Sequence, residues 1–200
     1  MKSSDLTWRI GRIAGIAAIL SLSASILASW SFYPGPYGPF TNWISDLGNP
    51  ANNPDGAKFM NAGLILTGIL FFPFCLGLYR WHGDEKIRKA SFVLAMIAGF
   101  TAALSMVMIG TFPENYAVQH QAFALGLFVS LGLFLFLSAW HLVACSKDPK
   151  IRGIAYFGFA AGLVDVAFGL VFYDHIFEWV AAFASLGYVA LLAYGMYRKS

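Results

Sequence analysis

Carboxylate and histidine side chains gather in the segments that separate the apolar stretches of the chain. Glu114 and His120 lie around one such segment, and Asp174, His175 and Glu178 lie around another. Imidazole and carboxylate groups together are ligands that suit Zn²⁺ or a similar divalent ion. Histidine also titrates near neutral pH, which suits general acid–base chemistry. These residue types allow either a metal site or an acid–base pair, provided that the fold brings the two segments together.

The longest polar segment, residues 33–56, contains Asn-Trp-Ile-Ser-Asp-Leu-Gly at positions 42–48. Its prolines and glycines predict a structured turn rather than a flexible linker. Thr41 is a candidate N-cap for a short interfacial helix that would carry Ser45 and Asp46 and end at the glycine. The segment therefore adds a hydroxyl and a carboxylate to the groups that could form a site.

Ordinary structural roles explain several of these groups equally well. Asp174 is a candidate cap for the last long helix, with Glu178 in its first turn, where the helix dipole favours a negative charge. Asn53 and Pro54 have the residue types of a cap and first helical position. His175 fits a solvated position at the membrane interface. These alternatives stay open at the level of the sequence.

The elements that position these groups are predicted to be membrane-spanning helices. The chain is 58 % hydrophobic and 12 % charged, whereas a soluble domain has roughly 25 % charged residues. Six apolar stretches reach the length of about 20 residues that a helix needs to cross the hydrocarbon core. They are Ile10–Phe32, Ala57–Tyr79, Ala90–Phe112, Ala122–Cys145, Ile154–Tyr173 and Ile176–Met196. We therefore predict one all-α domain over residues 1–200, a bundle of six transmembrane helices.

The distribution of Lys and Arg predicts how this bundle is oriented. Of the 13 Lys and Arg residues, all except Lys58 fall in the N-terminal segment, the C-terminal segment or the loops after the second and fourth stretches. Cytoplasmic loops of membrane proteins are enriched in these residues. Both termini are accordingly predicted in the cytoplasm, in a multi-pass protein of the cell membrane. Residues 33–56, Glu114 and His120 would then lie on the outer side.

One carboxylate falls inside an apolar stretch. Asp165 lies about halfway along the fifth stretch, where a charged group costs about 2.5–3.5 kcal/mol on insertion scales. It should therefore face the bundle interior and find a hydrogen-bond partner, or act as the coupling group of a small transporter. The candidate partners are the hydroxyl groups of Ser21, Ser23, Ser25, Thr101, Ser105 and Ser185.

Other patterns narrow the classes of function. No cluster of basic and aromatic residues indicates nucleic-acid binding. Cys75 and Cys145 lack paired metal-binding spacing and are expected to be packing residues rather than a disulfide. Gly158 and Gly162 form a pair of small residues that allows helices to approach closely. The expected partners are membrane lipids and, for a bundle of this kind, a second copy or another membrane protein.

The segment at 42–48, together with Gly-Thr-Phe-Pro-Glu at 110–114 and then His120, resembles the family called domain of unknown function 998. This family consists of prokaryotic six-span membrane proteins. The chain is also distantly similar to the DRAM/Sfk-type proteins of eukaryotes, whose first outer loop contains a similar Ile-Ser-Asp-x-Gly stretch. The resemblance implies the six-span architecture and draws attention to the outer loops, but it implies no reaction. The eukaryotic relatives are tied to lipid and membrane homeostasis, which favours lipids as ligands.

Three functions are compatible with these observations. The first is a non-catalytic scaffold or accessory subunit, in which Asp46 ties the outer loop across the bundle. The second is an outer-face membrane-embedded hydrolase or lipid-handling protein that uses a carboxylate–histidine site, with a divalent metal as its possible cofactor. The third is a transporter dependent on Asp165. The candidate catalytic residues are Ser45, Asp46, Glu114 and His120, and the candidate metal ligands are His120, Asp46 and His175.

Overall fold

Six long helices and one short 3₁₀ helix form the regular secondary structure of the residues that the structure, a computed structural model, describes: 3–78 and 86–198. Each long helix is long and apolar enough to cross a membrane, so the predicted all-α architecture with six spans is confirmed. The elements are α1 (Ser3–Ser31), η1 (Ser45–Gly48), α2 (Ala57–Gly77), α3 (Lys86–Thr111), α4 (Ala117–Cys145), α5 (Pro149–Leu170) and α6 (His175–Arg198).

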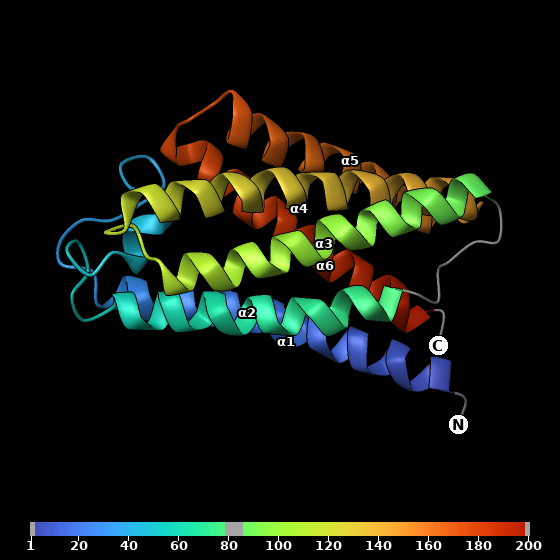
Figure 1. Cartoon of the computed structure of the whole chain (residues 1–200), viewed down its shortest axis with the longest axis horizontal. Helices are drawn as coiled ribbons and strands as arrows, with labels where there is room; N and C mark the ends of the chain where they lie inside the picture. Colours follow the sequence, from blue (N-terminus) through green and yellow to red (C-terminus); the bar gives the residue numbers. More distant parts are fainter. Residues whose placement is uncertain (1–2, 79–85, 199–200) are drawn as a thin grey trace.

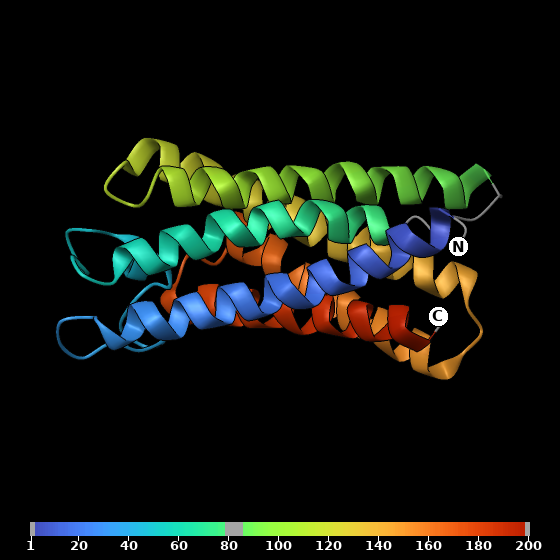
Figure 2. The same cartoon turned by 90° about the horizontal axis from the view of Figure 1, so that it is seen from below.

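The helices lie side by side along the long axis of the molecule (Figures 1 and 2). Each packs against the next one in sequence, and α6 packs against α1, which closes the six helices into a ring. The first helix begins and the last helix ends at the same end of the bundle. Residues 32–56, 112–116 and 171–174 connect the helices at the opposite end, which we call the loop end.

The position of both termini at one end agrees with an even number of spans. Which end of the bundle faces the cytoplasm stays a prediction. Three of the basic residues that support the predicted orientation, Lys2, Arg80 and Lys199, lie outside the described residues.

Several helices begin earlier than the hydropathy of the sequence predicts. The fourth begins at Ala117 and the fifth at Pro149, where Asp148 caps the helix by accepting a hydrogen bond from the Lys150 N–H at 2.9 Å. Hydropathy detects only the part of a helix that is apolar, whereas a helix can continue beyond the hydrocarbon region wherever its first backbone groups find partners. The predicted end of the second stretch, Tyr79, lies outside the described residues.

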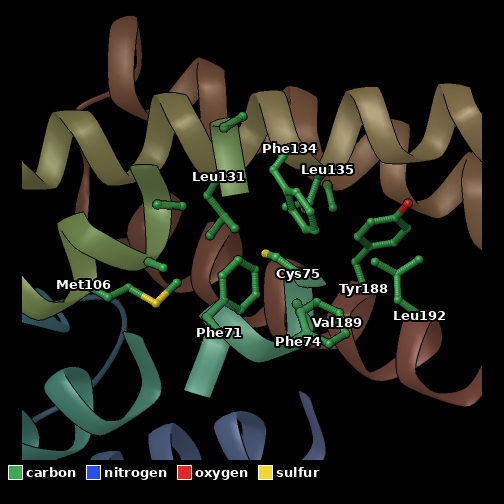
Figure 3. Close-up of a cluster of buried hydrophobic side chains, with 14 of the residues drawn as sticks. Phe71, Phe74, Cys75, Met106, Leu131, Phe134, Leu135, Tyr188, Val189 and Leu192 are labelled. Carbon is green, nitrogen blue, oxygen red and sulfur yellow. The ribbon is translucent and has the colours of Figure 1, made fainter. Parts of the chain in front are cut away.

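The centre of the ring is filled by apolar side chains, and those labelled in Figure 3 belong to α2, α3, α4 and α6. Phe71 and Phe74 of α2 contact Phe134 of α4 with their rings edge to face, at centroid distances of 5.4 and 6.5 Å. Cys75 is buried in the same cluster, Cys145 is exposed, and neither of them forms a disulfide bond. The core therefore connects α2 and α4 across the ring and holds the helices that carry the loop end in place.

Close helix contact makes Gly162 a sensitive position for stability. A Cβ atom there would lie 2.7 Å from the Gly132 carbonyl oxygen of α4, whereas a Cβ at Gly153 of the same helix would meet nothing within 4 Å. Overpacking of this kind costs about 1–3 kcal/mol. We expect Gly162→Ala to lower the thermal unfolding temperature in detergent and Gly153→Ala to leave it unchanged or slightly raised. Equal unfolding temperatures of the two variants would contradict the close contact.

Candidate functional site

The first connection, residues 32–56, is tied to α1 and α2 by buried hydrogen bonds. Asn53 donates its side-chain N–H groups to the carbonyl oxygens of Ser29 and Leu47, at 3.0 and 3.1 Å. The Ser29 hydroxyl donates to the same Leu47 carbonyl at 2.8 Å. Asn61 of α2 donates to the Gly48 carbonyl at 2.9 Å. The short helix η1 is therefore held over the ends of both helices.

The same connection is tied to α6 by two further bonds. The buried Glu178 carboxylate accepts a hydrogen bond from the Ile44 N–H at 2.6 Å. It also interacts with the backbone N–H and the side-chain hydroxyl of Ser45. The Trp179 indole donates to the Asn42 carbonyl at 2.9 Å. Since α1, α2 and α6 all hold it, residues 42–53 form a clasp across the loop end, and we use this name below.

The clasp differs locally from its sequence-based prediction. The expected interfacial helix is present only as the 3₁₀ helix Ser45–Gly48 and has no side-chain cap, because the Thr41 hydroxyl donates to Asn42 Oδ1 at 2.8 Å instead. The assigned helix α2 begins at Ala57, but Asn53 caps the turn that leads into it: its side-chain oxygen accepts from the Gly56 N–H at 3.2 Å and its backbone carbonyl from the Ala57 N–H at 2.9 Å. Its amide N–H groups make the buried contacts between the clasp and α1.

Two carboxyl groups meet beside the clasp. Asp46 accepts hydrogen bonds from the Trp43 N–H at 3.0 Å and the Asn52 side chain at 2.8 Å. Glu114 is half-buried, accepts a hydrogen bond from the Asn49 side chain at 2.9 Å and lies close enough to Asp46 for the negative charge of Asp46 to act on it. Burial, reinforced by the negative charge of Asp46, raises the pKa of Glu114 above its usual value of 4.5.

This raised pKa predicts a pH dependence of stability. Because the folded state holds the Glu114 proton more tightly, the stabilisation is complete below about pH 4.5 and is lost as the pH rises through the raised pKa. Wild type should therefore lose thermal stability over that interval, and Glu114→Gln should lose less of it. Unfolding temperatures measured from pH 4 upward test this, and identical slopes for the two proteins would contradict it. The titratable groups that interact with Glu114 are Asp46, His120, Tyr33, Tyr37, Tyr173 and Glu178, and all are present in both proteins.

His120 is held in one orientation at the start of α4. It is buried, and its Nδ1 lies 3.1 Å from the Phe112 carbonyl oxygen. Since a carbonyl oxygen only accepts, Nδ1 carries the hydrogen in this contact, and in the neutral ring Nε2 is therefore an acceptor. The backbone thus fixes the tautomer, as it does for histidines that bind ligands or move protons.

Two cavities meet at His120. The polar cavity, about 440 Å³, opens at the loop end between the clasp, α4, α5 and α6, and its walls include Trp43, Glu114 and Gln121. The apolar chamber, about 110 Å³, lies deeper in the ring and is lined by side chains of the core, among them Phe71, Leu131 and Val189 (Figure 3). Five residues line both spaces: Ser45, His120, Ala124, Phe128 and Glu178.

The predicted catalytic residues are brought together at the polar cavity. Ser45, Glu114 and His120 line it, and Asp46 does not line it but lies close to Glu114. His175 does not line it, because its ring packs on Trp43 at a centroid distance of 4.4 Å. The described residues contain no group of three or more His, Cys, Asp and Glu side chains that could hold a metal ion.

Three further residues line the polar cavity: Glu178, Trp43 and Tyr173. The sequence grouped Glu178 with the carboxylates that could form a site but did not select it as a catalytic residue, and it did not place the two aromatic residues in a site. Asp174 does cap α6, accepting from the Ile176 N–H at 3.0 Å, but Glu178 is more than an acid in the first helical turn. One helical turn after Asp174 it faces inward and binds the clasp. Its position next to the interfacial Trp179 is the one sequence signal for such a role.

Asp165 lies outside both cavities. Its Oδ2 accepts a hydrogen bond from the Ser185 hydroxyl of α6 at 2.7 Å, which selects one partner among the six predicted hydroxyl groups. Its Oδ1 has no hydrogen-bond partner among the described residues. Since Ser185 lines the apolar chamber, Asp165 supports the chamber wall from behind.

These features define a class of protein, a multi-pass membrane protein with a closed ring of six helices and a polar cavity at the loop end. The chain belongs to the family described as protein of unknown function (DUF998), whose family model matches residues 16–195. No curated protein and no solved structure matches it. The distant similarity to DRAM/Sfk-type proteins stays a prediction.

Proposed function

We propose that the protein is a lipid-handling protein that binds one amphiphilic molecule at the loop end. The observation that carries the proposal is the pair of adjoining cavities, one polar and one apolar, which share Ser45, His120 and Glu178. A head group would occupy the polar cavity and an apolar tail would enter the chamber. Because the Lys and Arg residues that the structure describes, except Lys58, lie towards the other end of the bundle, we infer that this site faces the outside of the cell membrane.

The energetics of such binding place specificity in the polar cavity. A lipid tail is already in an apolar medium, so moving it from the bilayer into the chamber gains little free energy. The head group, in contrast, would exchange water for oriented partners such as the Glu114 carboxylate and His120 Nε2. Ligand choice should therefore follow the head group, with the chamber limiting the shape of the tail.

Blocking the junction between the two cavities tests the proposal. Ala124 lines both of them, and an indole there would fill the junction. We expect the wild-type protein to keep a stoichiometric lipid after detergent exchange, detected by native mass spectrometry, and Ala124→Trp to lose it. Val118→Trp is the control, because Val118 lies on the same helix and is 79 % exposed. Equal lipid retention by both variants would exclude the cavities as the binding site.

A scaffold or accessory-subunit role is supported by a different observation, the hydrogen bonds that Asp46 makes within the clasp. Both oxygens of Asp46 accept hydrogen bonds from the clasp itself, from Trp43 and Asn52. In this role Asp46→Ala should lower the thermal unfolding temperature, and the intact clasp would be the surface that a membrane-protein partner contacts. Loss of lipid from Asp46→Ala without loss of stability would favour the lipid-handling function instead.

A further inference from the structure

The polar cavity has an aromatic wall. Trp43, Phe128, Phe168 and Tyr173 all line it. The Trp43 and Tyr173 rings have centroids 4.6 Å apart, and Phe168 lies 6.3 Å from the first and 6.1 Å from the second. Phe128 meets Phe168 edge to face at 4.5 Å. Aromatic rings beside an open cavity attract organic cations wherever a ring face is accessible to the ligand.

Acidic side chains outnumber basic ones around this cavity. Glu114 and Glu178 line it together with His120, Asp46 lies next to Glu114, and no Lys or Arg is among the lining residues that the structure describes. A bare anionic head group would therefore meet two acidic side chains and no Lys or Arg. The His120 Nε2 acceptor adds a further group that an N–H donor can bind.

The adjoining chamber has a hydrogen-bond donor in its wall that is available to a ligand. The Thr67 hydroxyl lines the apolar chamber on α2 and is buried, with the residue 3 % exposed. It has no hydrogen-bond partner among the described residues. A buried hydroxyl without a partner is uncommon, and an ester or hydroxyl oxygen in the tail of a ligand would accept its hydrogen bond.

We propose that the head group taken by the polar cavity carries an ammonium cation, so that the ligand is an amphiphile with an amine, a quaternary ammonium or a zwitterionic head. The ammonium would lie against the ring faces of Trp43 and Tyr173, with Glu114 as the counter-charge at the opening. This inference rests on the proposed function and adds the chemical class of its ligand. It makes Glu114 and Tyr173 residues that determine specificity.

Three single-chain amphiphiles with the same 16-carbon chain length separate the alternatives: hexadecyltrimethylammonium, lysophosphatidylcholine and lysophosphatidylglycerol. Affinities are measured by native mass spectrometry on the full-length protein in a neutral maltoside detergent. The two ammonium-bearing probes should bind about tenfold more tightly than lysophosphatidylglycerol, since a desolvated cation–π contact and a carboxylate both favour them. Equal affinities for all three would overturn the ammonium assignment and leave amphiphile binding intact. Binding of none would overturn the proposed function as well.

Matched variants assign the preference to this cavity. Glu114→Gln should reduce the ammonium preference to about threefold or less, as expected when the counter-charge is removed. Asp55→Asn is its control, because Asp55 is an exposed carboxylate near the loop end that does not line the cavity. Tyr173→Leu removes one ring face at a position that is 75 % exposed, so this variant is expected to fold, and its preference should fall likewise. A full ammonium preference in Tyr173→Leu and in folded Glu114→Gln would overturn the assignment.

Discussion

Asn53→Ala is expected to lower the free energy of unfolding by about 3 kcal/mol, since it removes several buried hydrogen bonds at once. The Asn53 side chain is fully buried and donates to the Ser29 carbonyl, the Ser29 hydroxyl and the Leu47 carbonyl. Its carbonyl oxygen accepts from the Gly56 N–H at 3.2 Å. Alanine would leave that N–H and the Ser29 carbonyl without this partner, in a site closed to water. Chemical denaturation in mixed micelles gives the free-energy difference.

Asn52 supplies the matched control for this prediction. It has the same side chain as Asn53, directly precedes it in the sequence and is exposed, and its side chain donates one hydrogen bond to Asp46 Oδ1 at 2.8 Å. Asn52→Ala should cost about 1 kcal/mol or less, because water can replace an exposed partner. If both variants lose the same stability, the clasp is not held by Asn53, and its buried bonds do not contribute as the structure indicates.

The difference between these two asparagines also shows where sequence-based prediction ends. The Asn-Asn-Pro segment has the residue types of a turn and helix start, and a turn is indeed present before α2. Which amide turns inward depends on the carbonyl groups of Ser29 and Leu47. Those come from a helix end and from η1, and no local pattern specifies their distance from Asn53.

The six helices were predictable because the thickness of the bilayer sets the length and apolar composition of a spanning helix, and each segment can be tested for these separately. The orientation of each helix about its own axis was not predictable. A helix that is apolar on all sides carries little periodic signal, so the sequence could not show which face of α4 directs His120 towards the cavity. For the same reason Asp165 had six candidate partners, and only the packing of α5 on α6 selects Ser185.

The candidate site was predicted in part. The sequence grouped Ser45, Asp46, Glu114 and His120 because polar side chains in the connections between long apolar stretches are easily recognised. It did not include Glu178, since a first-turn acid on a helix has a sufficient local explanation. It also did not include Trp43 and Tyr173, because aromatic residues are common at membrane interfaces and their types alone do not distinguish a cavity wall from a lipid contact.

Glu178→Ala is expected to detach the clasp from α6 and to lower the free energy of unfolding by about 2–5 kcal/mol, since it leaves the buried amides of Ile44 and Ser45 without an acceptor. Glu178→Gln keeps one acceptor oxygen and should lose roughly half as much. Asp174→Ala is the control on the same helix. Its exposed carboxylate caps α6 through the Ile176 N–H alone, so its loss should cost about 1 kcal/mol.

Hydrogen exchange distinguishes a detached clasp from a generally weakened bundle. In Glu178→Ala the amides of Ile44 and Ser45 should exchange much faster, while the amides in the middle of α2 and α4 keep their wild-type protection because the core of Figure 3 is untouched. In Asp174→Ala only the first turn of α6 should change. Faster exchange throughout the bundle in Glu178→Ala would show that this carboxylate supports the whole fold. Unchanged exchange at Ile44 would show that the clasp does not depend on it. Because Glu178 lines both cavities, the local outcome would mean that one carboxylate holds the clasp closed over the proposed lipid site.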